Sequence, residues 1–286
     1  MPKLGIQGTP GSYHEQAALG YQPTAENEIM YLPTFRDVFA ALADGRCDQA
    51  LVAVANNAIG FIHEPYSYIT KDAGKTVRIV GETYVRAEHH LWGVQGAVLK
   101  DITHIHSQSP ALQQCSRFLH DSVQDVEIVE EADTALSAQK VAQWQDASRA
   151  AIASQRAGEL HGLHKLAAAV QDEPDNITRF VLLQRAQDAT KIEHGDHDKT
   201  TCLLQTTMRP GALASALVPF REAQVSISSL QSQFIPNSPF QMQFFIEFEA
   251  GLHDSRTTRV IDWLEGLGCT LSVLGTYAAE PVPMRS

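Results

Sequence analysis

The 286-residue chain lacks an apolar run long enough to cross a membrane, and it has no excess of basic residues. A membrane-spanning helix needs about 20 consecutive apolar residues, and the opening segment MPKLGIQG is too short and too soon interrupted to be a secretory signal. The 33 Asp and Glu outnumber the 22 Lys and Arg, giving a net charge of −11, whereas nucleic-acid binding needs a basic face. We therefore expect a cytoplasmic protein that binds neither nucleic acid nor membrane.

Cysteine is also scarce, and no segment shows the spacing of metal ligands. Cys47, Cys115, Cys202 and Cys269 are scattered and form no C-x-x-C pair, so we expect reduced thiols. The segment HGDHD at 194–198 contains histidines, but no apolar stretch holds it in place, and we interpret it as solvated linker. The sequence thus predicts no metal site.

The hydrophobic pattern divides the chain into an α/β part and a smaller α+β part. Up to residue 187, strands are expected at 4–7, 50–54, 103–106, 127–129, 150–154 and 180–183, and helices at 13–20, 35–44, 110–120 and 134–144. A polar linker follows at 188–198. The expected order is then strand 200–208, helix 211–223, strand 225–234, strand 240–249, helix 254–267 and strand 270–277. This βαββαβ order is typical of a ferredoxin-like domain.

Two predicted helices begin with patterns that suit an anion. In GTPGSYHEQAA, Ser12 and Glu15 have the spacing of a capping box, and the glycines let backbone approach a ligand. In HSQSPALQQC, Ser109 is expected to cap the next helix and Pro110 to occupy its first turn. Free N–H groups at a helix start attract anions. Each start alone is an ordinary capped helix, but two of them on facing lobes would hold a small dianion at both ends.

The segment DNITRFVLLQR places Thr178 and Arg179 directly before a buried apolar run. Polar groups at a strand entry either satisfy backbone ends or face a ligand. The local pattern does not choose between a strand cap and a part of a ligand-binding cleft.

These segments together resemble the prephenate dehydratase family over nearly the whole chain. The similar segments are GTPGSYHEQAA, VAVANNAIGFIHEPYSYI, AEHHLWGV, IHSQSPALQQCSRFL, AAIASQRAGELHGLHKL, DNITRF and RPGALASAL. Thr178-Arg179-Phe180, in this order after the other segments, is the most specific of the signals. The resemblance implies two lobes of a periplasmic-binding-protein-like α/β fold followed by a ferredoxin-like ACT domain. It places the catalytic domain at 1–187, with lobe one at about 1–76 plus 156–187 and lobe two at about 77–155, and the ACT domain at 199–280.

The resemblance also implies an activity and a site. The family converts prephenate to phenylpyruvate with loss of carbon dioxide and water, without a cofactor, as a dimer or tetramer whose ACT domain senses phenylalanine. The implied catalytic residues are Thr178, Asn56, Gln114 and Ser107. The expected substrate-binding residues are Arg179, Phe180, Ser12 and Asn57, and the expected effector-binding residues are Gly211, Ala212, Leu213, Gln231 and Ser232. His89 and His90 flank a strand of the second lobe and could support the cleft, but we favour packing or solvent roles for them.

Several residues depart from the family pattern. The glutamate that precedes Asn56 in the family is Ala55 here, and the histidine after Ser107 is Gln108. In the last domain, the family's E-S-R-P segment is Q-S-Q-F at 231–234, so both charges are absent. We therefore expect weakened phenylalanine binding or a different effector. Two other hypotheses stay open: a prephenate decarboxylase that leaves the ring non-aromatic, and a ligand sensor without turnover.

Overall fold

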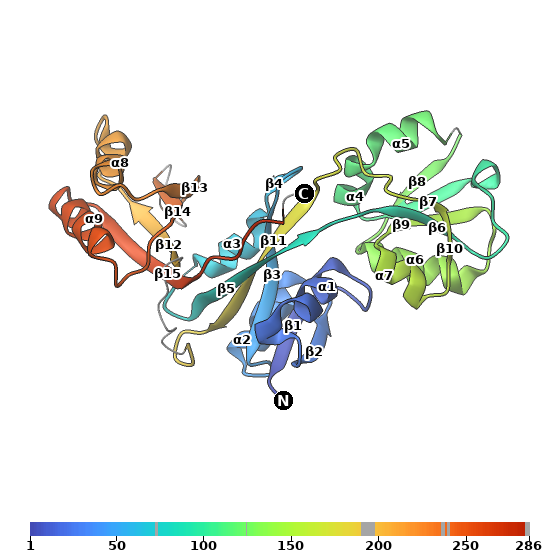
Figure 1. The fold of residues 1–286 in the computed structure, drawn as a ribbon, viewed down its shortest axis with the longest axis horizontal. Coiled ribbons are helices and arrows are strands. Elements are labelled where there is room, and N and C mark those ends of the chain that lie inside the picture. Colours follow the sequence, from blue (N-terminus) through green and yellow to red (C-terminus); the bar gives the residue numbers. More distant parts are fainter. Residues whose placement is uncertain (72–73, 124, 190–197, 236–237, 239–240, 284–286) are drawn as a thin grey trace. The chain divides into compact units, whose positions relative to one another are not determined.

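The computed structural model describes residues 1–71, 74–123, 125–189, 198–235, 238 and 241–283 (Figure 1). The chain divides into two compact units. Unit 1 comprises Met1–Ile62, Thr83–Phe180 and Val282–Ser286, and unit 2 comprises His63–Glu82 and Val181–Pro281. Most of both predicted lobes belongs to unit 1, although 63–82 and 181–187 belong to unit 2. The predicted linker at 188–198 lies mostly outside the described residues, and the domain boundaries stay predictions.

The first sheet has the strand order β2-β1-β3-β11-β5. Its strands are β1 (Lys3–Gln7), β2 (Glu28–Leu32), β3 (Gln49–Asn56), β5 (Val77–Arg86) and β11 (Ile177–Arg185), and the short β4 (Gly60–Phe61) pairs with β3. β1 pairs in parallel with β2 and β3. The unbroken apolar run at 50–54 is buried, as is typical of a central parallel strand. The helices α1 (Tyr13–Gly20) and α2 (Phe35–Ala43) and the short helical turn η1 (Gln22–Thr24) belong to this part of unit 1.

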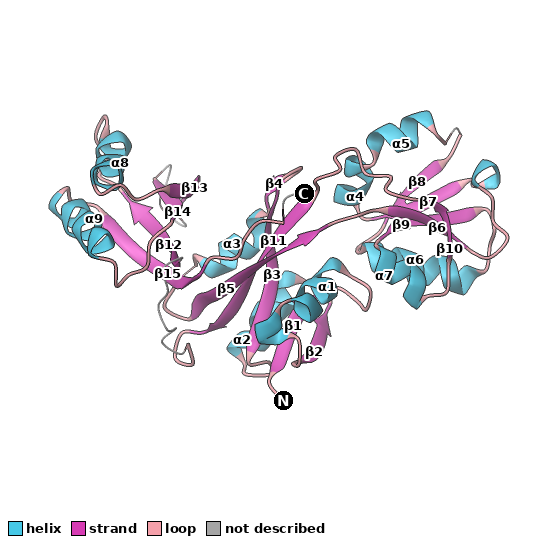
Figure 2. Ribbon diagram, in the orientation of Figure 1, coloured by secondary structure: helices cyan, strands magenta, loops and turns pink. Residues whose placement is uncertain are grey.

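The second sheet has the strand order β10-β6-β9-β7-β8. Its strands are β6 (His90–Gly93), β7 (His104–Ser107), β8 (Glu127–Glu130), β9 (Arg149–Ala153) and β10 (His164–Ala167). Figure 2 shows α6 (Thr134–Trp144) and α7 (Gln155–Leu160) on one side of this sheet and α4 (Ser109–Gln114) and α5 (Ser116–Asp121) on the other. The short helical turn η2 (Leu99–Asp101) precedes β7. A Cβ on Gly158 would lie 2.2 Å from the Trp92 ring, so α7 can approach β6 only with glycine there.

The C-terminal part of unit 2 has the predicted βαββαβ order. It contains β12 (Asp198–Gln205), α8 (Ala212–Glu222), β13 (Ile227–Phe234), β14 (Met242–Phe248), α9 (Ser255–Gly266) and β15 (Thr270–Ala278), with the strand order β13-β14-β12-β15. Phe220, Phe248 and Leu264 share the core between sheet and helices. On the other face, Phe245 packs edge-on against Tyr66 of α3 (His63–Ile69), with 4.4 Å between ring centroids.

The predicted fold class is confirmed, but several element boundaries were wrong. The helix expected at 110–120 is interrupted at Cys115, whose φ of −115° and ψ of 21° leave helical geometry. The strand expected at 150–154 ends at Ala153, because the Ser154 side chain accepts a hydrogen bond from the Ala157 N–H and caps α7. The strand expected at 200–208 begins earlier, at Asp198, and ends at Gln205.

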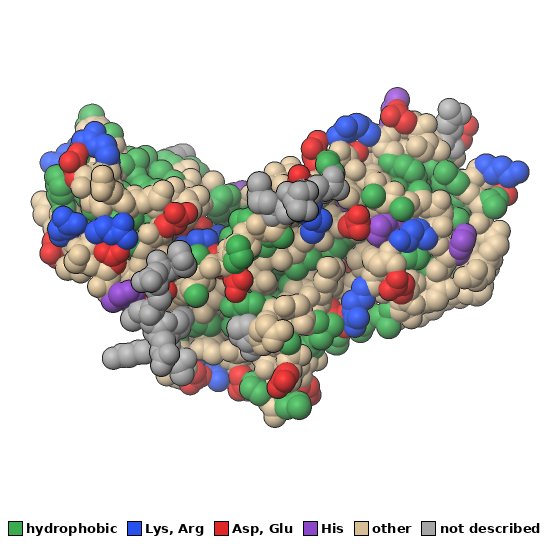
Figure 3. Space-filling view, viewed as in Figure 1, with side chains coloured by type: hydrophobic (Ala, Val, Ile, Leu, Met, Phe, Trp, Pro, Cys, Tyr) green, Lys and Arg blue, Asp and Glu red, His purple; other side chains and the backbone are tan. Residues whose placement is uncertain are grey.

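Among the described residues, no helix has both the length and the apolar composition to span a bilayer. On the face drawn in Figure 3, acidic and basic side chains are interspersed.

Candidate functional site

A cavity of about 190 Å³ in unit 1 brings together residues that are far apart in the sequence. Among the described residues, three helices begin at this cavity: α1, α4 and α6. They line it with Ser12, Tyr13, His14, Gln108, Pro110, Ala111, Asp133 and Thr134. Asn56 from the end of β3 and Thr178 and Phe180 from β11 complete the polar and aromatic part of the lining. The cavity therefore collects the partial positive charge of several helix starts close to the Thr178 hydroxyl group.

The start of α1 differs in one respect from the predicted capping box. The Ser12 hydroxyl accepts a hydrogen bond from the Glu15 N–H at 3.3 Å, as expected. The Glu15 carboxylate, however, accepts from the Gly11 N–H at 2.9 Å and also bonds to Tyr31 and Arg156. Burial opposes its ionisation, but these hydrogen bonds outweigh burial and lower the pKa of Glu15. Among the described residues, the N–H groups of Tyr13 and His14 have no acceptor, so they are available to an anion.

The start of α4 was predicted incorrectly. Gln108, not Ser109, is the N-cap residue, and no side chain caps this helix. The Ser109 hydroxyl instead donates to the Glu130 carboxylate at 3.1 Å. Pro110 does occupy the first turn, as predicted. Gln108 and Pro110 line the cavity, whereas Ser109 does not.

Asn56 fixes the orientation of the polar residues at the cavity wall. Its Oδ1 accepts hydrogen bonds from the N–H groups of Ala58 at 2.9 Å and Ile59 at 3.2 Å. Because a backbone N–H can only donate, the other terminal atom of Asn56 must be the amide nitrogen. This nitrogen donates to Asn176 Oδ1 at 2.7 Å and to Thr178 Oγ1 at 2.9 Å.

The same reasoning extends to Gln114 and His89. Asn176 Nδ2 donates to Gln114 Oε1 at 2.9 Å, and Gln114 Nε2 donates to Asn56 Oδ1 at 3.3 Å. His89 Nε2 lies 2.8 Å from Gln114 Oε1. Since this oxygen is an acceptor, His89 Nε2 must carry a proton and donate it. His89 Nδ1 faces the Tyr13 hydroxyl at 2.9 Å. Burial lowers the pKa of His89 to about 4, so its ring is neutral near pH 7.

Thr178 is therefore held as a hydrogen-bond donor. Its oxygen accepts the Asn56 amide proton, so its own proton is available to a ligand in the cavity. Phe180, two residues further along β11, lines the same cavity because alternate strand residues share a face. Its ring meets the His14 ring edge-on, with 5.1 Å between centroids. His14 Nε2 accepts the Ala53 N–H at 3.2 Å, and burial lowers the pKa of His14 to about 3.

Arg179 and Asn57 lie in a different place from Thr178. Arg179 follows Thr178 directly in β11, so its side chain leaves the opposite face of the sheet. It lines a separate cavity of about 540 Å³ together with Phe61 and Tyr84. Asn57 also lines that cavity, and its side chain bonds to the backbone at 175–177. The structure does not bring either residue into the Thr178 cavity.

Ser107 is likewise absent from the residues that line the cavity. It is 0% exposed, and its hydroxyl donates to the Ile152 carbonyl at 2.7 Å, which joins β7 to β9. Of the predicted catalytic residues, the structure brings together Thr178, Asn56 and Gln114.

Sequence reasoning did not assign several polar residues of this site. Among them are Tyr13, His89 and Asp133, which line the cavity, and Asn176, which bonds to Asn56 and Gln114. Asn176 stands in the DNITRF segment, two positions before Thr178, so the period of a strand would have indicated it. Asp133 precedes a helical pattern, which predicts an N-cap but not a place in a cavity. We expected His89 to have a packing or solvent role, yet it bonds to Gln114 and lines the cavity.

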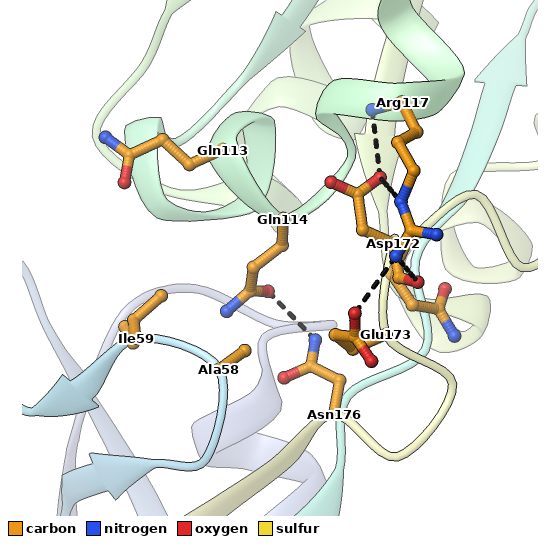
Figure 4. Close-up of a pocket in the computed structure, with 9 residues that line it drawn as sticks. Ala58, Ile59, Gln113, Gln114, Arg117, Asp172, Glu173 and Asn176 are labelled. Carbon is orange, nitrogen blue, oxygen red and sulfur yellow. Dashed lines mark hydrogen bonds and ion pairs between the residues drawn. The ribbon is translucent and has the colours of Figure 1, made fainter.

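Lys and Arg side chains are absent from the lining of the Thr178 cavity as far as the structure describes it, and Asp133 carries the one carboxyl group there. An adjoining cavity of about 370 Å³ shares Ile59 and Gln114 with it (Figure 4). There, the Arg117 guanidinium pairs with the carboxylates of Asp172 at 3.9 Å and Glu173 at 3.0 Å, so its charge is already compensated.

In unit 2, three of the predicted effector residues line one cavity. Gly211, Ala212 and Leu213 surround a space of about 420 Å³ together with Met242 and Phe244. Gly211 has a φ of 78°, which favours glycine before α8. Gln231 and Ser232 lie on β13 and do not line this cavity.

Comparison with known proteins gives one consistent family. The model of the family described as prephenate dehydratase matches residues 4–188. The chain is 32% identical to a bifunctional N-acyl-homoserine lactone acylase/prephenate dehydratase of Komagataeibacter europaeus, covering 97% of this chain and 96% of that protein. It is 29% identical to the bifunctional chorismate mutase/prephenate dehydratase of Escherichia coli K12, covering 98% and 72%. The structure of prephenate dehydratase in complex with L-Phe from Arthrobacter aurescens is similar with a TM-score of 0.86 and 25% identity, covering 98% and 93%.

Proposed function

The chain belongs to the prephenate dehydratase family, and we propose that it converts prephenate to phenylpyruvate, carbon dioxide and water in the cytoplasm, as a step toward phenylalanine. The observation that carries this proposal is the cavity at which α1, α4 and α6 begin and to which Thr178 presents a hydroxyl oriented by Asn56.

Helix starts, rather than basic side chains, would bind the carboxylates of the substrate. The N–H groups of Tyr13 and His14 are available at the start of α1, and backbone N–H groups at a helix start bind anions well. Gln108, at the start of α4, lines the same cavity and offers its side-chain amide. Moderate stabilisation of the carboxylate charge suits this reaction. The bond between the ring and one carboxylate must break, and its electrons must pass into the ring.

Thr178 would assist the departure of the ring hydroxyl. As the C–O bond breaks, negative charge grows on the leaving oxygen, and a hydrogen bond from Thr178 strengthens with it. At the same time the bond to the leaving carboxylate breaks, its electrons complete the aromatic ring and carbon dioxide is released. The apolar side chains of Phe35, Ile62 and Phe180 line the same cavity, and a low-polarity wall favours loss of a charged carboxylate.

Incubation of the protein with prephenate tests the proposal and separates it from its alternatives. We expect phenylpyruvate, identified by NMR and mass spectrometry, to appear with one equivalent of carbon dioxide. A hydroxylated, non-aromatic keto acid would instead indicate a decarboxylase that retains the hydroxyl group. Tight binding of prephenate without any product would indicate a sensor.

A second candidate function is hydrolysis of an N-acyl-homoserine lactone, the acylase activity in the name of the Komagataeibacter relative. The cavity favours it in one respect: its described lining is rich in apolar side chains and has no Lys or Arg, which suits a neutral substrate with an acyl tail. Hydrolysis of an amide also needs an activated nucleophile. Among the described residues, neither the Ser12 nor the Thr178 hydroxyl bonds to a histidine or carboxylate that would activate it. Mass spectrometry after incubation with N-hexanoyl-homoserine lactone tests this candidate, and release of hexanoic acid would support it.

We also propose that the C-terminal domain is an ACT domain of a homodimer or homotetramer. It would bind an amino-acid effector beside Gly211, Ala212 and Leu213. Titration calorimetry is expected to show weak phenylalanine binding. Loss of a charged hydrogen-bond partner costs ~1.5–3 kcal/mol, which is roughly tenfold or more in affinity. Tight binding of phenylalanine would contradict this prediction, and analytical ultracentrifugation would give the assembly.

A further inference from the structure

Asp133 is a buried carboxyl group in the Thr178 cavity that the chemistry described so far does not use. It is the N-cap residue of α6, it is 9% exposed, and it lines the cavity together with Thr178 and Asn56. Its position at a helix start gives it an evident structural role as a cap. Its two oxygens, however, have different surroundings.

One oxygen of Asp133 does all of the capping. Oδ1 accepts the N–H groups of Ala135 at 2.7 Å and Leu136 at 3.0 Å, and the Thr9 hydroxyl lies 3.5 Å from it. Oδ2 points toward the β1–α1 loop. A Cβ built on Gly8 of this loop would lie 2.7 Å from Asp133 Oδ2 and 3.2 Å from the Ser12 hydroxyl oxygen. Oδ2 is therefore not used for capping. It faces the β1–α1 loop, whose last residue, Ser12, lines the cavity.

Among the described residues, no Lys or Arg side chain lines the cavity beside Asp133 to keep it ionised. Gly8, Thr9 and Ser12 face it from the β1–α1 loop, and Ala135 and Leu136 from its own helix. The other titratable groups that line the cavity are Tyr13, His14 and His89. Burial raises the pKa of Tyr13 and lowers those of His14 and His89, so all three are neutral near pH 7.

We propose that Asp133 is the proton donor to the departing hydroxyl group of the substrate. Thr178 can strengthen a hydrogen bond to that oxygen, but an alcohol is too weak an acid to transfer its proton at neutral pH. In the proposed step, the C–O bond and the bond to the carboxylate break together. The electrons of the latter enter the ring, and the Asp133 proton converts the leaving hydroxide to water. Solvent then returns a proton to the carboxylate, so no other reactant is needed.

A further observation supports this role. Burial raises the pKa of Asp133, because the apolar surroundings disfavour the charged form more than the Leu136 and Ala135 N–H groups stabilise it. The inference rests on the proposed dehydration of prephenate.

Replacing Asp133 with asparagine or serine separates proton donation from capping, because both residues are good N-caps and neither is an acid. We expect kcat for prephenate to fall at least about 100-fold in D133N and D133S at pH 7, the lower range for loss of a general acid. In the unmodified protein kcat should fall as pH rises above the pKa of Asp133, and this decline should disappear in D133N. D254N is the matched control, because Asp254 caps α9 in unit 2 and lines no part of the cavity. It should retain normal turnover.

A second measurement does not depend on turnover. Carbon-13 NMR of the Asp133 carboxyl group, assigned by comparison with D133N, should show a titration midpoint above the ordinary value for aspartate of about 3.9. A midpoint at or below that value would overturn the inference, as would folded D133N with a normal rate and pH profile. Absence of prephenate turnover in the unmodified protein would overturn the proposed function, and the proton-donor role with it. Turnover that persists unchanged in D133N would overturn the proton-donor role alone.

Discussion

Replacing Thr178 with valine is expected to lower kcat for prephenate by about 100- to 10,000-fold, the usual range for loss of a positioned proton or hydrogen-bond donor. Valine has the shape of threonine but no hydroxyl, and it suits a strand, so β11 should persist. The Asn56 amide would lose one acceptor but would keep its bond to Asn176. The expected loss is therefore chemical rather than structural. Steady-state kinetics of phenylpyruvate formation provide the measurement.

T178S is the matched control, since serine keeps the hydroxyl group and can still accept from Asn56. It should retain far more activity than T178V. If the Thr178 hydrogen bond forms mainly in the transition state, kcat and kcat/KM should fall together while KM changes little. Near-normal kcat in folded T178V, with circular dichroism like that of the unmodified protein, would remove Thr178 from the mechanism.

Part of this site could be predicted from sequence because its residues stand at the ends of strands and the starts of helices. Ser12 and Thr178 were found in this way, and the resemblance added Asn56 and Gln114. The bonds that join Asn56 to Gln114 and Asn176 could not be predicted, because they connect residues 58 and 120 positions apart. Only the folded topology sets such contacts.

Arg179 was expected to bind the substrate beside Thr178, but it lines a different cavity, and strand geometry explains why. Adjacent residues of a strand point to opposite faces, so Thr178 and Arg179 cannot both enter the same cavity while β11 stays regular. The placement of Ser107 has a comparable reason. It is the last residue of β7, and its hydroxyl bonds to the adjacent strand, so it helps to hold the sheet together.

Several of the elements that the sequence analysis missed are short and have weak local patterns, although the ten-residue β5 was missed as well. α7 has six residues, and its packing depends on the close approach of Gly158 to Trp92. β6 has four residues and is entirely buried, so it shows no alternation. Longer segments with a full period, such as α6 and β14, were found with small errors at their ends. Long-range packing, rather than local propensity, determines the short elements.

Lowering the pH from 7.5 to 4.5 is expected to destabilise the folded protein through His14. Burial holds the pKa of His14 at about 3, compared with 6.5 for an ordinary histidine. The unfolded chain therefore binds a proton that the folded protein excludes. The stabilising contribution is fully present above pH 6.5 and is lost as the pH falls toward 3. Each unit of separation corresponds to about 1.4 kcal/mol, so the loss between pH 6.5 and 4.5 amounts to roughly 2–3 kcal/mol.

H14Q isolates this contribution from the carboxylates that titrate in the same range. A glutamine at position 14 can still accept the Ala53 N–H, but it does not titrate. Free energies of unfolding from urea titrations at pH 7.5, 5.5 and 4.5 should therefore decline less steeply in H14Q than in the unmodified protein. His89, whose pKa burial lowers to about 4, should add a smaller loss of the same sign in both proteins. If the free energy of unfolding declined equally steeply with falling pH in both proteins, His14 would accept a proton in the folded state as well. Its ring would then bring a positive charge into the cavity beside Phe180.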